Sequence, residues 1–162
     1  MKTGEQAPDF ELPDETGRMR KLSDLLASGP VVLYFYPAAM TAGCTRESCH
    51  FRDLGAEFAE VGATRVGISA DAVERQREFS DKHSFDFPLL SDPDRGVAEA
   101  FGVKRGLGLP NKRSTFVIAP DRTVVAVISS EINMNGHADK ALAALRQLGS
   151  GRPGAPGAPW SA

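Results

Sequence analysis

The chain has 162 residues, of which 41% are hydrophobic and 25% are charged, and its formal net charge is -2. This composition predicts one globular domain with a substantial core. Because the chain has no basic block, we expect neither nucleic acid nor anionic membranes as partners. Residues 1–15 lack the apolar core of a signal peptide, and no run approaches the roughly 18 apolar residues of a membrane span. We therefore expect a cytoplasmic protein, in which cysteines are more often catalytic than part of a permanent disulfide framework.

The N-terminal third predicts a short hairpin followed by a buried strand. Residues 9–13 and 18–21 flank a cluster of turn residues and are expected to pair as a hairpin. Ser23 is a candidate cap for a brief helix at 24–27. Residues 31–36 are all β-branched, aromatic or Leu, without polar alternation, which indicates a strand covered on both faces of a sheet.

Helices and strands are predicted to alternate after this strand. Apolar residues recur at three- to four-residue spacing from Phe51 to Val61, which predicts a helix that begins near 43–45 and runs to about residue 60. Asp71 is the expected N-cap of the next helix. The elements expected here are a strand at 64–69, a helix at 72–83, a strand at 87–90 and a helix that starts at 92–94.

The last third combines a loop, a hairpin and a helix. Residues 102–112 hold three glycines and several cations and are expected to form a loop that borders a site. Strands at 115–119 and 123–129 lie on either side of a tight connection, which predicts an antiparallel hairpin. An amphipathic stripe predicts a terminal helix at 138–148, opened by His137.

Alternating strands and helices with an added hairpin predict an α/β fold, in which a mixed sheet is covered on both faces. The domain is expected to span residues 1–148. Residues 149–162 consist mainly of Gly, Pro, Ala and Ser and are expected to form a flexible tail, because they cannot bury enough apolar surface to order themselves.

Both cysteines follow the buried strand closely. Pro37 ends the strand, small residues favour a turn, and the helix that follows places Cys44 in its first turn. There the unpaired backbone N–H groups and the helix dipole favour a thiolate over a thiol, so Cys44 is a candidate nucleophile. The alternative is a buried cysteine that acts as a small hydrophobe, which does not fit the polar neighbours Thr45, Arg46 and Glu47.

These residues resemble a known family. The active-site motif of the peroxiredoxins is similar to Pro37-x-x-x-Thr41-x-x-Cys44, and the PrxQ type, the bacterioferritin comigratory proteins, is similar to Gly43-Cys44-Thr45-x-Glu47-x-Cys49-x-Phe51-Arg52-Asp53. The segment that carries the family's active-site arginine resembles Arg113-Ser114-Thr115-Phe116-Val117-Ile118. The resemblance covers about residues 4–148.

The resemblance implies a thioredoxin-like fold with a mixed central sheet, flanking helices and an N-terminal β-hairpin. It implies a thiol-dependent peroxidase for hydrogen peroxide and organic hydroperoxides, and leaves the preferred peroxide open. Cys44 would become a sulfenic acid, Cys49 would resolve it as an intramolecular disulfide, and thioredoxin or a glutaredoxin-like dithiol would reduce that disulfide. A monomer or weak dimer without a cofactor is expected.

The remaining site candidates each have a second interpretation. Thr41 offers a hydroxyl to the thiolate or the peroxide, or simply caps the helix. Pro37 shields the sulfur, or only closes the strand. Arg113 is expected to approach Cys44 and keep it ionised, with Lys104, Arg105 and Lys112 as rival cations.

Glu47 lies three residues after Cys44 on the same helical face. It would orient Arg113, or it is an acid of the first turn that the helix dipole favours.

Cys44 and Cys49 pose a geometric problem. On an intact helix their Cα atoms lie about 8.6 Å apart, whereas a disulfide requires less than about 7 Å. The expected disulfide therefore requires this helical turn to unwind.

Two other functions and a metal site are alternatives to the peroxidase. A redox-sensing interaction module could use the same thiol pair without turnover. A thiol-disulfide reductase would need two cysteines two residues apart, which the chain lacks. His50, His83 and His137 form no zinc-ligand pattern, so no metal is expected.

Overall fold

The computed structural model describes residues 1–150, which form a five-stranded mixed sheet in the order β5-β4-β3-β6-β7. The central strand β3 (Val31–Phe35) runs parallel to β4 (Thr64–Ser69), and β4 runs parallel to β5 (Leu89–Ser91). On the other side, β6 (Ser114–Ile118) is antiparallel to β3, and β7 (Val124–Ser129) is antiparallel to β6. The predicted mixed sheet and C-terminal hairpin are confirmed.

Strand β3 is the centre of the fold because both of its faces are buried. Its alternate side chains enter two separate cores: Val32 and Tyr34 pack in one, and Val31, Leu33 and Phe35 in the other. All five residues are fully buried. A run of apolar residues without polar alternation is what a strand between two layers of helices requires.

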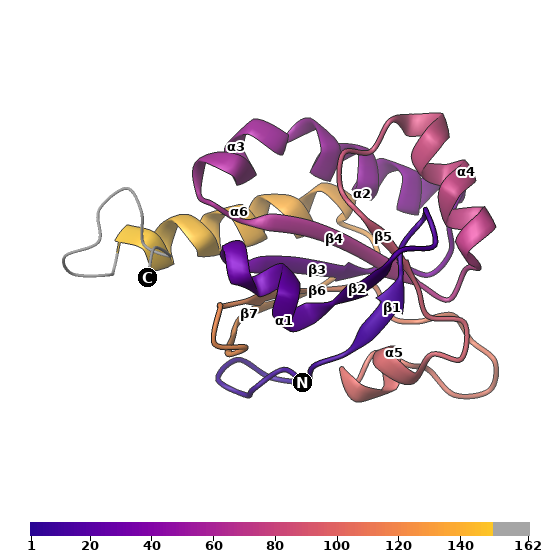
Figure 1. The fold of residues 1–162 in the computed structure, drawn as a ribbon, viewed down its shortest axis with the longest axis horizontal. Coiled ribbons are helices and arrows are strands. Elements are labelled where there is room, and N and C mark those ends of the chain that lie inside the picture. The colour runs from indigo at the N-terminus through magenta and orange to yellow at the C-terminus, as the bar shows by residue number, and fades with distance from the viewer. Residues whose placement is uncertain (151–162) are drawn as a thin grey trace.

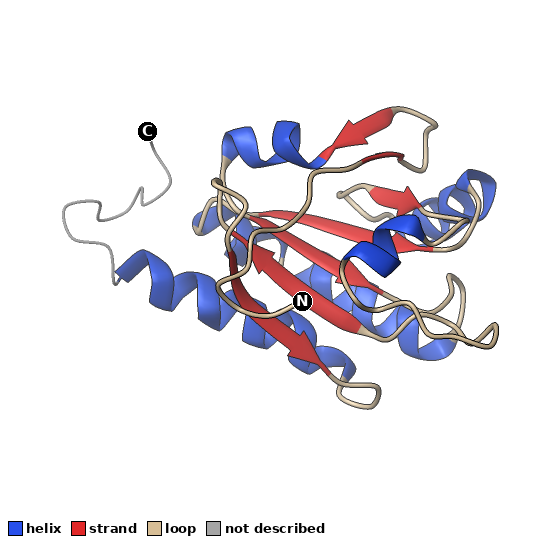
Figure 2. Cartoon of the chain, turned by 90° about the horizontal axis from the view of Figure 1, so that it is seen from below, coloured by secondary structure: helices blue, strands red, loops and turns tan. Residues whose placement is uncertain are grey.

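The two faces of the sheet are covered by different sets of elements (Figures 1 and 2). One core is closed by α2 (Ala42–Asp53), α3 (Gly55–Glu60), α4 (Val73–His83) and α6 (Met134–Ser150). The other is closed by α1 (Leu22–Leu25), η1 (Leu26–Ser28), α5 (Gly96–Ala100) and the N-terminal hairpin of β1 (Glu11–Pro13) and β2 (Met19–Lys21). Among residues 1–150, no helix is long and apolar enough to cross a membrane.

The predicted helix from 43–45 to residue 60 is two helices, with a break at Leu54. Arg65 on β4 explains the break, because its guanidinium donates a hydrogen bond of 2.8 Å to the carbonyl of Phe51 in the last turn of α2. The same guanidinium pairs with Asp86 at 3.0 Å. A carbonyl that the helix would otherwise leave unpaired is therefore satisfied by a neighbouring strand, although the apolar spacing continues into α3.

Two predicted caps are wrong. Ala72, not Asp71, is the N-cap of α4, and Asp71 instead accepts a 2.7 Å hydrogen bond from the backbone N–H of Ala39. Ser23 lies inside α1, where its hydroxyl donates to Asp9 at 2.9 Å. In both cases a polar side chain binds a distant loop rather than its own helix.

Element ends also shift. Helix α6 begins at Met134, four residues before the predicted start at 138, and runs to Ser150, so 149 and 150 are helical. Strand β5 begins at Leu89 rather than at 87. Residues 151–162 of the predicted flexible tail lie outside the described residues.

We predict that Gly67→Ala destabilises the protein by about 1–3 kcal/mol, the usual cost of overpacking a core. Gly67 lies opposite Tyr34 in the sheet, and an added Cβ would lie 2.9 Å from the Tyr34 ring and 2.8 Å from Leu89 Cδ2. Gly106→Ala is the matched control, because an added Cβ there meets nothing within 4 Å. Urea unfolding measures both; equal stabilities for the two variants would contradict this packing.

Candidate active site

Hydrogen bonds fix the loop that connects β3 to the first turn of α2. Tyr36 makes the last sheet-like hydrogen bond of this segment, from its N–H to the carbonyl of Ile68 at 3.1 Å. Asp71 then fixes the N–H of Ala39. Met40 has a φ of 69°, in the left-handed region, and turns the chain into the helix. Cys44 thus lies in the first turn of α2, as predicted.

Cys44 meets Arg113 in a buried contact. The Cys44 side chain is 0% exposed, and Arg113 Nη2 donates to its Sγ at 3.4 Å. Arg113 comes directly before β6, and the antiparallel register that pairs Ser114 with Phe35 brings it beside the end of β3. The guanidinium thus brings a positive charge and a hydrogen-bond donor to the sulfur.

Glu47 holds the same guanidinium. Arg113 Nη1 donates to Glu47 Oε1 at 2.8 Å, and both side chains are buried, with Arg113 5% and Glu47 0% exposed. The predicted role of Glu47 in orienting Arg113 thus has a direct contact behind it. The backbone N–H of Arg113 also donates to Glu131 at 2.9 Å, a partner that the sequence analysis did not identify.

Burial sets the electrostatics of this pair. It raises the pKa of Glu47 to about 8, although the charge of Arg113 pulls in the opposite direction. Burial alone would lower the pKa of Arg113, but the charges of Glu47 and Cys44 outweigh it and raise that pKa. The carboxyl of Glu47 therefore exchanges its proton near neutral pH while Arg113 keeps its charge.

His137 lies next to Glu47, whereas the sequence predicts only that His137 opens the last helix. Its Nε2 bonds the carbonyl of Ser130 at 2.8 Å and must carry the proton, so its Nδ1 accepts from the hydroxyl of Thr115 at 2.8 Å. Nδ1 lies 3.5 Å from Glu47 Oε2, an oxygen without a hydrogen-bond partner. Burial lowers the pKa of His137, which keeps it neutral. The sequence feature that could have indicated this role is a histidine at a buried position of the apolar stripe of the last helix.

In the described part of the chain, none of the other candidates makes a hydrogen bond to the sulfur. The hydroxyl of Thr41 donates to the carbonyl of Ala38 at 2.8 Å, so it neither caps α2 nor donates to Cys44 here. Pro37 is half-buried and lies two residues after the end of β3. Two rival cations are paired elsewhere: Lys104 with Glu99 and Arg105 with Glu131, both at 3.5 Å.

The surroundings of Cys49 disfavour its thiolate. Cys49 is half-buried on the same continuous helix, α2, and both thiols are free. Burial raises the pKa of Cys49, against a smaller opposite effect of Arg52. Because Cys44 and Cys49 lie five residues apart on an intact helix, they cannot form a disulfide in this conformation, as predicted from the sequence.

Three further contacts hold this helix in place. The Tyr34 hydroxyl donates to Ser48 Oγ at 2.9 Å, and the Tyr34 ring stacks on Phe51 with centroids 4.3 Å apart. His50 Nε2 bonds Asp139 on α6 at 2.7 Å. None of these partners was identified from the sequence. Within residues 1–150, no three His, Cys, Asp or Glu side chains gather as metal ligands would.

The chain is similar in sequence and structure to known proteins. Residues 3–127 match the AhpC/TSA family. The crystal structure of peroxidoxin BcpB from Mycobacterium tuberculosis is 63% identical, with a TM-score of 0.89 over 91% of this chain and 98% of the other. The structure of the bacterioferritin comigratory protein of Xanthomonas campestris is 38% identical, with a TM-score of 0.77 over 85% and 90%. Peroxiredoxin Bcp of Bacillus subtilis is 38% identical over 91% of this chain and 97% of its own length.

The buried Glu47 carboxyl predicts a pH dependence of stability. Its pKa is about 8 in the folded protein against 4.5 in a model compound, so the folded state holds a proton that the unfolded state releases between these values. Stability must therefore fall as pH rises through this window. His137 has the opposite effect below its reference pKa of 6.5, so the effect of Glu47 is isolated between pH 6.5 and 8.

We expect Glu47→Gln to remove this fall, which is at most about 1.4 kcal/mol per pH unit for one proton. The comparison is made in a Cys44→Ser background, so that the thiol next to Arg113 does not titrate. Glu60→Gln, at an exposed carboxyl, is the control and keeps the fall because Glu47 is intact. Urea unfolding at several pH values measures it, and identical pH profiles for the Glu47 and Glu60 variants would contradict the burial argument.

Proposed function

Because the chain belongs to the AhpC/TSA family, and within it to the peroxiredoxins of the PrxQ or bacterioferritin comigratory type, we propose that it reduces peroxides with Cys44 as the attacking thiol. The observation that carries the assignment is the 3.4 Å contact between Cys44 Sγ and the buried Arg113 guanidinium at the start of α2. Of the two cysteines, only Cys44 has such a partner among residues 1–150.

In the first step, the Cys44 thiolate attacks one peroxide oxygen. An S–O bond forms as the O–O bond breaks, and the leaving oxygen takes a proton to become water or an alcohol. Negative charge moves from the sulfur to that oxygen, and Arg113 remains positive beside both. Hydrogen bonds from a guanidinium that Glu47 already holds in position need little rearrangement during the step. Thr41 and Pro37 are proposed to border the peroxide.

In the second step, Cys49 attacks the Cys44 sulfenic acid. An S–S bond forms, the S–O bond breaks and water leaves, so the two thiols have supplied the two electrons that reduced the peroxide. Cys49 reaches Cys44 only when the first turns of α2 unwind, since about 8.6 Å separate their Cα atoms on a helix. The raised pKa of Cys49 keeps it a thiol, which leaves the first attack to Cys44.

An external dithiol completes the cycle by thiol-disulfide exchange, and we propose thioredoxin or a glutaredoxin-like protein in the cytoplasm, whose reducing conditions suit such exchange. Organic hydroperoxides are included as substrates because the Xanthomonas campestris relative is described by its alkyl peroxide reduction activity. A monomer or weak dimer is proposed, because the two reacting thiols lie on one helix and need no second subunit.

Cys44→Ser and Cys49→Ser test the proposed order of reactions. The first variant is expected to lose peroxide consumption with any reductant. The second is expected to consume one equivalent of peroxide, leaving a Cys44 sulfenic acid that dimedone traps and that further peroxide converts to sulfinic acid. Mass spectrometry of the intact chain measures each product. Residual turnover in Cys44→Ser, or full thioredoxin-dependent turnover in Cys49→Ser, would contradict the assigned roles.

A further inference from the structure

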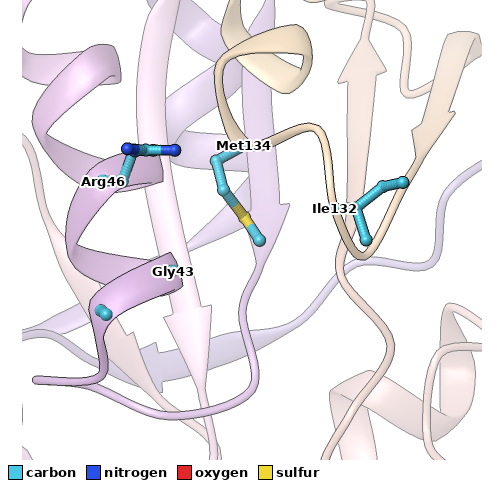
Figure 3. A pocket seen from close by; sticks show the side chains of 5 residues that line it. Gly43, Arg46, Ile132 and Met134 are labelled. Carbon is cyan, nitrogen blue, oxygen red and sulfur yellow. The ribbon is translucent and has the colours of Figure 1, made fainter.

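The start of α2 packs closely against α6. Figure 3 shows the pocket between the two helices, whose lining includes Gly43 of α2 and Met134 of α6. A Cβ built on Gly43 would lie 3.1 Å from Met134 Cε and 3.2 Å from Arg113 Nη2, so a larger residue does not fit here. Contact with α6 therefore fixes the first turn of α2 on this side. The loop of residues 37–41, which leads into this turn, is held by other groups.

This loop contains a residue in a strained conformation. Met40 has a φ of 69°, and this left-handed region is unfavourable for a residue with a Cβ. The hydroxyl of Thr41, which is proposed to border the peroxide, donates to the carbonyl of Ala38 in the same loop at 2.8 Å. Strain of this kind persists where surrounding contacts fix the backbone. The position of Thr41 therefore depends on the groups that fix the residues before it.

Asp71 fixes the residue directly before Met40. Its Oδ2 accepts a hydrogen bond of 2.7 Å from the N–H of Ala39 and one of 2.6 Å from the hydroxyl of Ser69, the last residue of β4. Because β3 and β4 are parallel, their carboxyl ends lie at the same edge of the sheet, which brings Asp71 next to the loop that follows β3. A hydrogen bond to a carboxylate is stronger than one between neutral groups.

A buried network holds Asp71 in turn. Gln76 on α4 donates from its Nε2 to Ser69 Oγ at 3.0 Å, and the hydroxyl of Tyr36 donates to Gln76 Oε1. The side chains of Tyr36, Ser69 and Gln76 are fully buried. The backbone carbonyl of Asp71 accepts from the hydroxyl of Ser91 on β5 at 2.6 Å. Contacts from β4, β5 and α4 therefore place the carboxylate that holds the loop.

We propose that Asp71 is a positioning residue for the attack on peroxide, because it holds the loop before α2 in the conformation in which Thr41 borders the peroxide. The proposal rests on the peroxidase function above and adds a residue to its first step. Asp71 acts on the loop, through the N–H of Ala39, and not on the reacting atoms. Without this hydrogen bond, Met40 relaxes from its left-handed conformation, and only a fraction of the molecules has the reactive geometry.

The test measures the second-order rate constant at which hydrogen peroxide oxidises Cys44, in a Cys49→Ser background that stops after the first step. Asp71→Ala is expected to lower this rate constant about tenfold, the lower end for loss of a hydrogen bond to a charged group. Asp71→Asn keeps an acceptor oxygen for Ala39 and is expected to lower it only about threefold, because a neutral acceptor gives roughly half the energy of a charged one.

Asp9→Ala is the matched control and is expected to leave the rate constant unchanged. Asp9 is also half-buried, and it accepts hydrogen bonds of 2.9 Å from both the N–H and the hydroxyl of Ser23. Ser23 belongs to α1, on the other face of the sheet. The control therefore removes the same kind of contact at a distance from the loop.

Thr41→Val separates positioning from a loss of stability. If Asp71 acts by placing Thr41, then Asp71→Ala has a smaller effect once the Thr41 hydroxyl is absent, and we expect a factor of about two to three. Urea unfolding verifies that each variant is folded. Ser69→Ala removes one hydroxyl that holds Asp71 and is expected to lower the rate constant about threefold, so it replaces Asp71→Ala if that variant does not fold.

The proposal is overturned, while peroxidase activity remains, by any of three results. These are an unchanged rate constant in folded Asp71→Ala or in the Ser69→Ala variant that replaces it, an equal loss in Asp9→Ala, and the same tenfold loss with and without the Thr41 hydroxyl. If peroxide does not oxidise Cys44 in the otherwise unmodified chain, the proposed function fails and this inference fails with it.

Discussion

The buried guanidinium of Arg113 is the group on which the site depends. It joins Cys44 and Glu47 on α2 to β6 at the sheet, and the backbone next to it is held by Glu131. A buried charge is costly unless it is paired and hydrogen-bonded, so the first turns of α2 cannot leave without exposing or orphaning Arg113. The position of the sulfur and the folding of the helix therefore follow from one set of contacts.

This arrangement places the two halves of the reaction in opposition. An intact helix favours attack on peroxide, because only then does Arg113, held by Glu47, contact Cys44. Disulfide formation requires that helix to open. We expect the unwinding of α2 to stop at Phe51, because the Phe51 ring stacks on Tyr34 and the Phe51 carbonyl accepts a hydrogen bond from Arg65. The segment that must unwind carries Glu47 and Ser48, each tied by a single hydrogen bond to the rest of the core.

The sequence predicted what depends on local pattern. The apolar run at 31–36 specified the central strand, and the residues after it placed Cys44 at a helix start. Arg113 was found through its resemblance to a family segment, since no local pattern separates it from Lys112 or Arg105. What depends on distant partners was missed. Arg65 ends α2 from a neighbouring strand, Asp71 binds the loop before α2 rather than its own helix, and His137 reaches Glu47 from α6. Such contacts join residues far apart in the chain, so spacing alone does not contain them.

Disulfide formation is expected to unfold the beginning of α2, and amide hydrogen exchange across residues 45–50 measures this unfolding. The reduced protein is compared with the disulfide form, with the amides of β3, which is paired on both sides, as an internal reference. We expect slow exchange across 45–50 in the reduced form and fast exchange in the disulfide form, because Cys44 and Cys49 cannot meet on an intact helix. Reduction by a dithiol is expected to restore the slow exchange. Equal protection of this segment in both forms would contradict it, and would leave Cys49 as an ordinary helix residue.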